Sequence, residues 1–589
     1  MPYGGNTRVM ARRSVADQFV EILLAAGVRR MYGVVGDSLN PVVDSIRRHT
    51  GIEWVHVRHE ETGAFAAGAE AQLTGRLTAC AGSCGPGHVH LVNGLYDAHR
   101  SMAPVLGLAA HVPSSELGTG YFQETNPGLL FADCSYSCAL VSHPEQLARV
   151  TQIATQEALG RGGVAVVVLP GDVAALDASS AYLEHTYRLD QRPQPRPSEL
   201  VLDELVGLLD RARRVTIFCG RGVAGAHDAV VALAERLKAP VGHALRGKDW
   251  IAYDNPYDVG MSGLLGYGAC YEAMHSCDLL LLLGTDFPYV QFMPTEPTIV
   301  QVDVARERLG RRSKLDLGVW GDARETVEAL LPRVAEKTDR TFLDRMLRRH
   351  RELLERVNAY SRGVRGRRPI HPEQVAATLD ELAADDAVFT VDTGMCCVWA
   401  ARMIRATGRR RLLGSFNHGS MANALPQAIG ALFPDRNRQV IAMAGDGGFA
   451  MLMGDFLTLL QYDLPVKIVL FDNGSLGMVE LEMLVAGLQP FQTRLTNPDF
   501  AAMARAAGIT GIRIEDPGDV ESGLAEALNT PGPALVDVIT DPNALSMPPK
   551  ITPGQVKGFA LAMSRIVLAG DADAALTMAR SNLRNLPRP

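Results

Sequence analysis

Oxygen-bearing side chains follow two strongly apolar segments in the last third of the chain. Asp446 stands in the Gly-Asp-Gly-Gly motif 445–448, directly after the apolar run 440–444, and Asn473 follows the apolar run 466–471. Both runs are typical of buried parallel strands, whose carboxyl ends form the ligand-binding edge of open α/β sheets. A carboxylate, an amide oxygen and a nearby main-chain carbonyl suit a hard cation such as Mg²⁺, which also binds phosphate groups. The glycines allow the backbone to approach such phosphates, although the first motif taken alone is equally compatible with a tight turn.

A second candidate group is Glu60, which lies between the apolar run 54–57 and the small-residue run 63–69. The pattern predicts a strand that ends shortly before Glu60 and a closely packed helix that follows it. Burial at such a junction raises the proton affinity of a carboxylate and makes it a candidate for proton transfer. A glutamate without this context would more often be a surface charge.

Composition describes an ordinary globular protein of several domains. The chain has 589 residues, 47% of them hydrophobic and 21% charged, with a net charge of −7, so nucleic acid is not an expected partner. No segment approaches the roughly 20 uninterrupted apolar residues of a spanning helix, and residues 1–13 lack a signal-peptide pattern, so we expect a cytoplasmic protein. The nine cysteines are scattered. Cys134 with Cys138, and Cys396 with Cys397, suggest metal or redox sites, but reduced core residues are the favoured interpretation.

Two linker-like segments, 191–197 and 364–372, divide the chain into three blocks. Apolar strands alternate with helical stretches in each block, which predicts an α/β protein with three doubly wound parallel sheets. The expected domains are 1–190, 198–345 and 369–545, followed by a tail, 546–589. The clearest predicted strands are 30–35 and 164–169 in the first block, 215–218 and 279–283 in the second, and 440–444, 466–471 and 534–538 in the third.

The tail contains a basic amphipathic pattern over residues 571–586. Apolar residues recur there at helical spacing and arginines are interleaved with them. The pattern predicts a helix that either lies on an anionic membrane surface or packs on its own protein.

Four longer runs, 58–75, 80–87, 120–125 and 416–423, resemble the thiamine-diphosphate-dependent enzyme family. Within that family they are most similar to the flavin-containing pyruvate dehydrogenase (quinone) and pyruvate oxidase group. The resemblance extends from about Val15 to the C-terminal helix. It implies a pyrimidine-binding, an FAD-binding and a diphosphate-binding domain, with a C-terminal amphipathic helix.

The resemblance also implies a role for each thiamine-site residue. Glu60 matches the carboxylate that activates the cofactor, and it would serve the diphosphate site of another subunit, so a homotetramer is expected. Asp446, Asn473 and the main-chain oxygen of Ser475 match the Mg²⁺ ligands. The remaining matched positions are Phe122 and Gln123 near the substrate, Gly419 as acceptor of the pyrimidine amino group, Met421 as the wedge that bends the cofactor, Gly445, Gly447 and Gly448 at the diphosphate, and Met478 where an aromatic residue is usual near the substrate.

The middle block contains a Gly-x-Gly-x-x-Gly pattern at 220–225 after a predicted strand. The acidic residue expected about 20 positions further on is missing, so a nicotinamide site is the poorer interpretation. The block instead resembles the flavin domain of the family. The residues implied for FAD are Ser262, Gly263, Leu264, Leu265, Thr285, Asp286 (where a glutamine is usual), Phe287, Pro288, Tyr289 and, at a ribose hydroxyl pair, Asp303.

The expected activity is oxidative decarboxylation of pyruvate to acetate and CO₂ through a thiamine-bound enamine. The electrons would pass to FAD and then to ubiquinone, and the tail would bring the protein to the inner face of the cell membrane. Alternatives are a phosphate- and oxygen-dependent pyruvate oxidase, a carboligase similar to acetolactate synthase, and an inactive homologue that acts as a binding protein. Asp472, in place of the first of two asparagines, and a tail without an aromatic anchor are further departures from the pattern.

Overall fold

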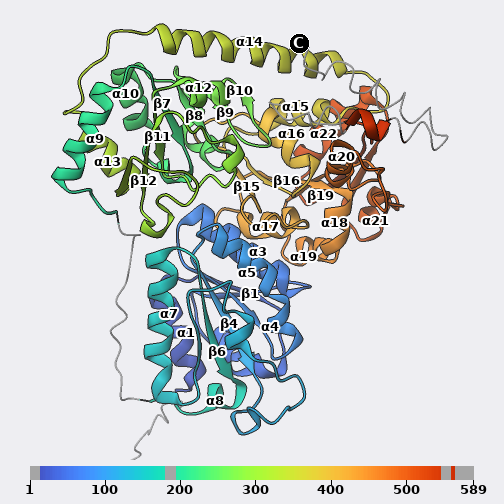
Figure 1. Cartoon of the computed structure of the whole chain (residues 1–589). Coiled ribbons are helices and arrows are strands. Elements are labelled where there is room, and N and C mark those ends of the chain that lie inside the picture. The colour runs from blue at the N-terminus through green and yellow to red at the C-terminus, as the bar shows by residue number, and fades with distance from the viewer. Residues whose placement is uncertain (1–12, 180–193, 545–558, 564, 566–589) are drawn as a thin grey trace, which may run out of the picture. The chain divides into compact units, whose positions relative to one another are not determined.

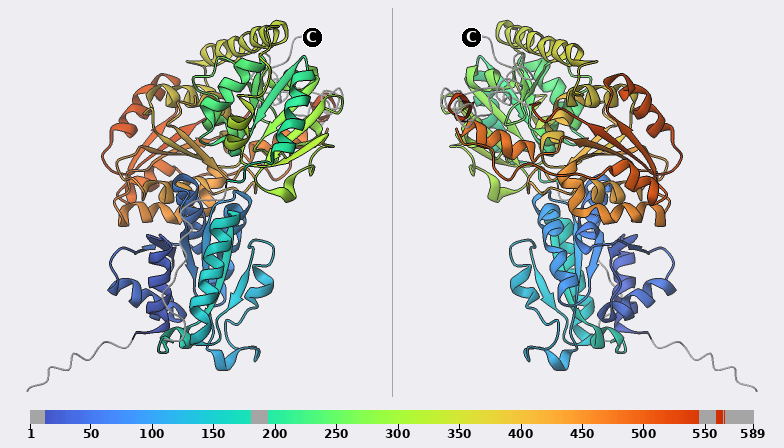
Figure 2. Two further views of the ribbon diagram at one scale, coloured as in Figure 1. Left: turned by 90° about the vertical axis from the view of Figure 1, so that its left-hand side faces the viewer. Right: turned by 90° about the vertical axis from the view of Figure 1, so that its right-hand side faces the viewer.

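The computed structural model describes residues 13–179, 194–544, 559–563 and 565. Its strands form three sheets, and helices lie on both faces of each (Figures 1 and 2). The described residues pack as two compact units. Of the described residues, unit 1 takes in those up to 179 together with 417–435 and 452–462, and unit 2 takes in those at 194–416, at 436–451 and from 463 onward.

The sheet of unit 1 is parallel throughout, in the order β2-β1-β3-β4-β6-β5. Its strands are β1 (Arg30–Gly33), β2 (Glu53–His56), β3 (Thr78–Gly82), β4 (Val105–His111), β5 (Cys138–Leu140) and β6 (Val164–Pro170). Its helices are α1 (Val15–Ala25), α2 (Asn40–Arg48), α3 (Glu60–Thr74), α4 (Pro86–His90), α5 (Val92–Arg100), α6 (Pro127–Leu130), α7 (Leu147–Arg161) and α8 (Gly171–Ala175), joined by α17 (Ala424–Leu432) and α19 (Phe456–Gln461) from later in the chain.

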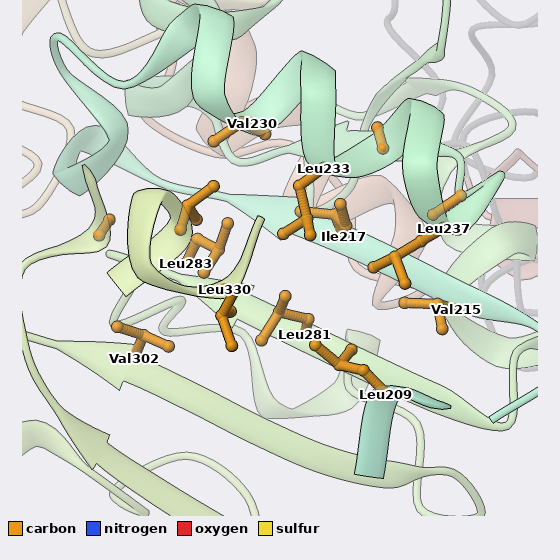
Figure 3. Packing of buried hydrophobic residues seen from close by; sticks show 14 of the residues in the cluster. Leu209, Val215, Ile217, Val230, Leu233, Leu237, Leu281, Leu283, Val302 and Leu330 are labelled. Carbon is orange, nitrogen blue, oxygen red and sulfur yellow. The ribbon is translucent and has the colours of Figure 1, made fainter. Parts of the chain in front are cut away.

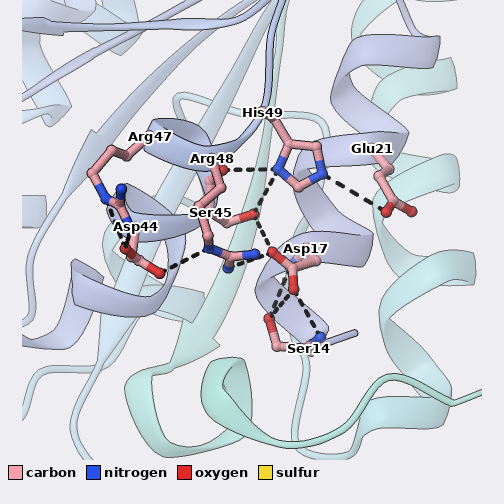
Figure 4. Close-up of polar contacts among 8 residues, drawn as sticks. All are labelled: Ser14, Asp17, Glu21, Asp44, Ser45, Arg47, Arg48 and His49. Carbon is pink, nitrogen blue, oxygen red and sulfur yellow. Dashed lines mark hydrogen bonds and ion pairs between the residues drawn. The ribbon is translucent and has the colours of Figure 1, made fainter. Parts of the chain in front are cut away.

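A network around Asp17 ties α1 to α2 (Figure 4). Asp17 and Ser14 form a capping box at the start of α1. The Asp17 carboxylate also accepts hydrogen bonds from Ser45 Oγ at 2.7 Å and from Arg48 Nη2 at 2.6 Å. Burial alone would raise the pKa of Asp17, but these hydrogen bonds hold it below its usual value. The buried charge is therefore part of how the two helices are joined.

The middle sheet belongs to unit 2 and has the order β10-β9-β8-β7-β11-β12-β13, with only β10 antiparallel among its described strands. Its strands are β7 (Val215–Cys219), β8 (Val241–His243), β9 (Asp258–Met261), β10 (Tyr267–Gly268), β11 (Leu279–Leu283), β12 (Thr298–Asp303) and β13 (Leu317–Trp320). Its helices are α9 (Glu199–Arg211), α10 (His227–Leu237), α11 (Lys248–Ile251), α12 (Cys270–Ser276), α13 (Ala323–Leu330) and α14 (Thr341–Val364).

Alternate residues of the central strands of this sheet face opposite cores. Ile217 and Leu281 pack with Leu233 of α10 and Leu330 of α13 in one core (Figure 3). Phe218 and its neighbours Leu280 and Leu282 pack with α12 and the start of α14 in the other. A central strand buried on both faces reads as a continuous apolar run, which is why the strand at 279–283 could be predicted without error.

The third sheet, also in unit 2, is parallel in the order β15-β14-β16-β17-β19-β18. Its strands are β14 (Val388–Val391), β15 (Arg411–Gly414), β16 (Val440–Gly445), β17 (Lys467–Asp472), β18 (Thr510–Ile514) and β19 (Ala534–Ile539). Its helices are α15 (Pro372–Leu382), α16 (Met395–Met403), α18 (Asp446–Leu452), α20 (Gly477–Val485), α21 (Phe500–Ala506) and α22 (Val520–Asn529).

The predicted class, an α/β protein with three parallel-sheet domains, is confirmed. The strand order reverses between β1 and β3, between β7 and β11 and between β14 and β16, and such switch points are where open sheets bind ligands. Strand ends differ slightly from the prediction: β1 ends at Gly33 rather than at Val35, because Val35 lies outside the sheet and is 48% exposed.

All nine cysteines are free thiols, and only Cys138 is not fully buried, so the interpretation as reduced core residues is confirmed.

The predicted amphipathic segment 571–586 lies outside the described residues. Just before it, Phe559, Ala562 and Met563 pack on Leu484 of α20. Among the described residues, no helix is long and apolar enough to span a membrane.

Candidate functional site

Asp446 and Asn473 lie at one edge of the third sheet, because β16 and β17 are neighbours and Gly445, the last residue of β16, pairs with Phe471 near the end of β17. Asp446 Oδ2 accepts hydrogen bonds from the Gly474 amide at 2.9 Å and from Asn497 Nδ2 at 2.7 Å. The same Asn497 nitrogen is 2.8 Å from Asp472 Oδ1. Asn497 therefore bridges two buried carboxylates. Sequence reasoning missed it, since Asn497-Pro498 indicates only a turn.

This edge fits a divalent cation. Burial raises the pKa of Asp446 to about 6; the Asn497 hydrogen bond opposes this rise, and the neighbouring Asp472 carboxylate adds to it. A cation would offset the effects of both burial and Asp472. Ser475 Oγ donates a hydrogen bond to Glu480 Oε2 at 2.5 Å, so a cation would meet the main-chain oxygen of Ser475 rather than its hydroxyl. No heavy atom lies within 4 Å of where a Cβ of Gly445 would stand, which leaves room beside the carboxylate.

Glu60 is the first residue of α3, and His59 caps the helix. The Glu60 side chain is buried, as predicted, and its Oε2 lies 3.0 Å from His90 Nδ1. The His59 and His90 rings stack at 4.3 Å between centroids. One ligand atom of each of these three residues lies within 4.8 Å of the others, a spacing that a metal ion could also use. Sequence reasoning identified Glu60 but not His90.

The loop that carries Gly419 and Met421 belongs to the same unit as Glu60. Asn93 on α5 holds it: Asn93 Oδ1 lies 2.8 Å from His418 Nε2, and Asn93 Nδ2 donates to Ser420 Oγ at 2.8 Å. The same Nδ2 donates to Glu61, the residue after Glu60, at 2.7 Å. The structure thereby brings the loop at 418–421 beside the start of α3, through Asn93 and His418, two residues that the sequence did not single out.

Phe122 and Gln123 stand on a loop that the Glu124 carboxylate organises. Glu124 accepts hydrogen bonds from the amides of Gly118, Gly120 and Tyr121, and these bonds lower its pKa. Phe122 is 78% exposed, and Gln123 has a positive φ of 64°. An exposed aromatic on an ordered loop is available for a ligand or for another surface.

Met478 lies at the start of α20, in the segment that follows Asn473. It is half-buried and packs on the core of the third sheet. Asn473 and Met478 are therefore brought together by one short loop, in which a Cβ at Gly477 would lie 2.9 Å from Asn473 Nδ2.

The residues expected at the flavin gather where β9, β11 and β12 end, on both sides of the switch between β7 and β11. Ser262 is 3% exposed, and its Oγ has no hydrogen-bond partner among the described residues, which fits a hydroxyl that meets a ligand. Gly263 has a φ of 114°, and a Cβ there would lie 3.3 Å from the Phe287 ring. Asp303 is buried, which raises its pKa. Thr285 is buried, Leu265 and Tyr289 are half-buried, Leu264 and Pro288 are exposed, and Asp286 is paired with Arg311 and Arg312.

The glycine pattern at 220–225 serves backbone packing. The Gly222 amide donates to the Gly284 carbonyl at 2.9 Å, and a Cβ at Gly222 would lie 2.5 Å from Gly284 Cα. A side chain would not fit between these strand ends. The contact explains the pattern without a nicotinamide cofactor.

The described sites fall into two groups by unit. Glu60, Phe122, Gln123, Gly419 and Met421 belong to unit 1. The oxygen-ligand edge, Met478 and the residues expected at the flavin belong to unit 2. Each group is assembled within its own unit.

Comparison with known families agrees with the three-domain fold. Residues 13–128 match the N-terminal TPP binding domain of thiamine pyrophosphate enzymes, 202–330 their central domain, and 392–538 their C-terminal TPP binding domain. The chain belongs to the thiamine pyrophosphate enzymes.

Three relatives show how far the similarity extends. The putative thiamine pyrophosphate-containing protein YdaP of Bacillus subtilis is 34% identical over 553 residues, covering 93% of this chain and 95% of its own. The pyruvate oxidase of Lactiplantibacillus plantarum is 30% identical over 546 residues, 90% of this chain and 89% of its own. The acetolactate synthase isozyme 2 large subunit of Escherichia coli is 30% identical over 537 residues, 89% of this chain and 95% of its own.

Proposed function

We propose that this thiamine-diphosphate enzyme oxidatively decarboxylates pyruvate to acetate and CO₂, passing the electrons to FAD and then to ubiquinone. The observation that carries the proposal is the edge of the third sheet, where Asp446 and Asn473 follow strands paired in register. The similarity to a pyruvate oxidase and to an acetolactate synthase supports a 2-oxo acid such as pyruvate as substrate.

In this proposal, Asp446, Asn473 and the main-chain oxygen of Ser475 hold Mg²⁺, whose preference for oxygen ligands they satisfy. Gly445, Gly447 and Gly448 leave space for the diphosphate. When bound, thiamine diphosphate supplies a nucleophilic carbon and takes up the electrons freed by loss of CO₂.

Glu60 acts as the proton-transfer group. Its carboxylate would hold the proton shared with the pyrimidine ring, while His90 Nδ1, 3.0 Å from Oε2, orients it. The Gly419 carbonyl would accept a hydrogen bond from the amino group of the ring, and Met421 would pack against the cofactor. Asn93 keeps this loop in place through its contacts with His418 and Ser420.

Phe122, Gln123 and Met478 are proposed to surround the substrate. In the middle domain, Ser262–Leu265, Thr285–Tyr289 and Asp303 would hold FAD. The support for FAD is the unpartnered Ser262 hydroxyl and the position of all three segments at a switch point of the sheet.

The visible spectrum of the purified protein tests the proposal. We expect a flavin spectrum that bleaches when pyruvate is added without oxygen, in the presence of thiamine diphosphate and Mg²⁺. Glu60→Gln should retain flavin but bleach more slowly by about 10²-fold or more, since general acid–base groups contribute on this scale. Glu53→Gln, an exposed carboxylate in the same domain, is the matched control and should bleach normally.

Other outcomes select the alternatives. Flavin that stays oxidised while acetolactate forms would identify a carboligase, and folded protein without flavin would contradict the assignment of the middle domain. A Glu60→Gln variant as fast as the parent would show that Glu60 has another role. An inactive binding protein would bind thiamine diphosphate without consuming pyruvate.

We also propose that the protein is a homotetramer on the inner face of the cell membrane and that it reduces ubiquinone. The family resemblance and the basic pattern at 571–586 support this part of the proposal. The bleached flavin should be reoxidised by a ubiquinone analogue, faster with anionic vesicles. Reoxidation that instead requires oxygen together with phosphate would identify the phosphate-dependent oxidase.

A further inference from the structure

A cavity of about 890 Å³ lies within unit 2, between the middle domain and the start of the third domain. Its walls come from α11, from β9 and β10, from α14, from α15, and from the segment 402–409, which begins in the last turn of α16. None of the residues assigned above to thiamine diphosphate, Mg²⁺ or FAD lines it. The cavity is therefore a separate site in a part of the protein to which the proposed reaction gives no role.

Lys248 is the charged group most deeply buried in the wall. It is 4% exposed, and its Nζ donates to the Ala401 carbonyl at 2.5 Å and lies 5.5 Å from the centre of the Tyr267 ring. Among the described residues, no carboxylate lies within 4 Å of this ammonium group, and no second acceptor is present. An ammonium has three N–H donors, so two remain for a ligand.

The other groups near Lys248 do not neutralise it. Asp249 accepts a hydrogen bond from the Leu412 amide, and Asp380 is paired with Arg405 and Arg410. Asp258 lies close to His243 Nε2 and His350 Nε2, each 3.9 Å from one of its oxygens. Burial raises the pKa of Asp258 to about 7 and lowers the pKa of Lys248 to about 8. Burying a charge without a partner costs free energy, so the arrangement is explained most simply by an anion that binds there.

Arginines surround the rest of the cavity. Arg365, Arg405 and Arg409 are paired with carboxylates that also line the cavity. Arg362 on α14 is exposed and has no ion-pair partner among the described residues. Lys248 in the wall and Arg362 on α14 are thus two cationic groups available to one ligand.

The cavity wall also contacts the loop expected to hold the flavin. Arg402 Nε donates to the Leu265 carbonyl at 3.5 Å, a long hydrogen bond, and the Ser262 amide donates to the carbonyl of His243, the neighbour of Asp258, at 3.2 Å. A change in the wall at Arg402 would therefore reach residues 262–265 directly, and a change at Asp258 would reach them through its neighbour His243.

We propose that this cavity binds a small organic anion through Lys248 and Arg362, and that the bound anion modulates the flavin loop 262–265. The recognised chemistry is a carboxylate or a phosphate group. Binding itself does not depend on the proposed function; only the effect on flavin does. The two parts can therefore fail separately.

Calorimetric titration of the holoenzyme, saturated with thiamine diphosphate and Mg²⁺, tests binding. Inorganic phosphate and citrate are the two probes, and they distinguish a phosphate from a carboxylate ligand. We expect one of them to bind at millimolar concentration or below, and Lys248→Met to weaken it by at least about tenfold, the usual effect of losing a hydrogen bond to a charged group. Arg362→Gln should weaken it several-fold.

Arg356→Gln is the matched control, because Arg356 is also exposed on α14 but does not line the cavity. It should bind like the parent. The inference is overturned if neither probe binds the parent, if Lys248→Met binds equally well, or if Arg356→Gln and Arg362→Gln weaken binding equally.

Stability and flavin measurements complete the test. Lys248→Met retains most of the side-chain volume and removes a buried charge, but it also removes the donor to the Ala401 carbonyl, so its melting temperature should stay near that of the parent. Arg362→Gln tests the site should that variant fail to fold. The bound anion should change flavin fluorescence in the parent but not in Lys248→Met. Binding without any flavin response would overturn the modulation and leave the site in place.

Discussion

Asn497 shows how much a single amide can contribute to a site without being one of its expected ligands. Its Nδ2 donates to Asp446 Oδ2 and to Asp472 Oδ1, which keeps two buried carboxylates in fixed positions. Mutation of a group that orients metal ligands typically lowers metal affinity by about 10–100-fold. Asn497 is therefore a positioning residue for the proposed Mg²⁺ site.

Replacement of Asn497 by alanine should weaken Mg²⁺ binding by about tenfold or more, because it removes the side-chain amide that donates to both carboxylates and leaves only the Gly474 amide to bridge them. The measurement is the Mg²⁺ concentration that half-saturates thiamine diphosphate binding, followed by protein fluorescence. Asn529→Ala, an exposed position at the end of α22, is the control and should not change it. Unchanged Mg²⁺ dependence in Asn497→Ala would mean that the metal is held without this amide.

Among the elements, α3 is the one that close packing positions most strictly. Gly94 of α5 meets it on one side, where a Cβ would lie 2.6 Å from Ala64 Cβ. Gly430 of α17 meets it on another, where a Cβ would lie 2.0 Å from the Ala66 carbonyl oxygen. Because α3 begins at Glu60, these glycine contacts also determine where the carboxylate stands.

Gly430→Ala should therefore destabilise the protein by about 1–3 kcal/mol, the usual cost of overpacking, because the backbone of α3 would have to shift to make room for the added methyl group. Thermal unfolding measures the effect. Gly532→Ala, in a turn where no atom lies within 4 Å of the added Cβ, is the control and should leave the melting temperature nearly unchanged. Equal melting temperatures for both variants would contradict the close approach of α3 and α17.

For the whole molecule, buried carboxyl groups determine how stability depends on pH. Burial raises the pKa values of several of them above their usual range, to about 7 for Glu373 and Asp258 and to about 6 for Asp249 and Asp537. Each group binds more protons in the folded than in the unfolded state between its two pKa values. Its contribution to stability is complete below the unfolded pKa and is lost as the pH rises through the folded one.

Glu373, in the first turn of α15, is 4% exposed and offers the clearest test. Its pKa rises from 4.5 to about 7, so ionisation costs the parent up to about 3 kcal/mol of stability as the pH increases over that window. Glu373→Gln should be more stable than the parent at pH 8 by up to this amount, and the difference should vanish near pH 4. The measurement is the melting temperature of both proteins across that range; a difference independent of pH would contradict the raised pKa.

The local features of this protein were determined by its sequence alone. The apolar runs predicted the buried strands, with β11 correct at both ends, and they placed Asp446, Asn473 and Glu60 at the ends of strands or the start of a helix. These signals are local, because the alternation of apolar segments and turn residues needs only neighbouring residues to be read. The family followed from motifs of the same local kind.

The partners of those residues were decided only by the tertiary structure. Asn497 reaches Asp446, Asn93 holds His418, and Gly430 packs on Ala66, in each case across a long stretch of chain. The cavity at Lys248 likewise combines elements from two domains. No sequence pattern predicts such contacts, because they depend on which surfaces meet when helices and sheets pack together. Spacing along the chain therefore predicted which residues carry chemistry, and packing decided what surrounds them.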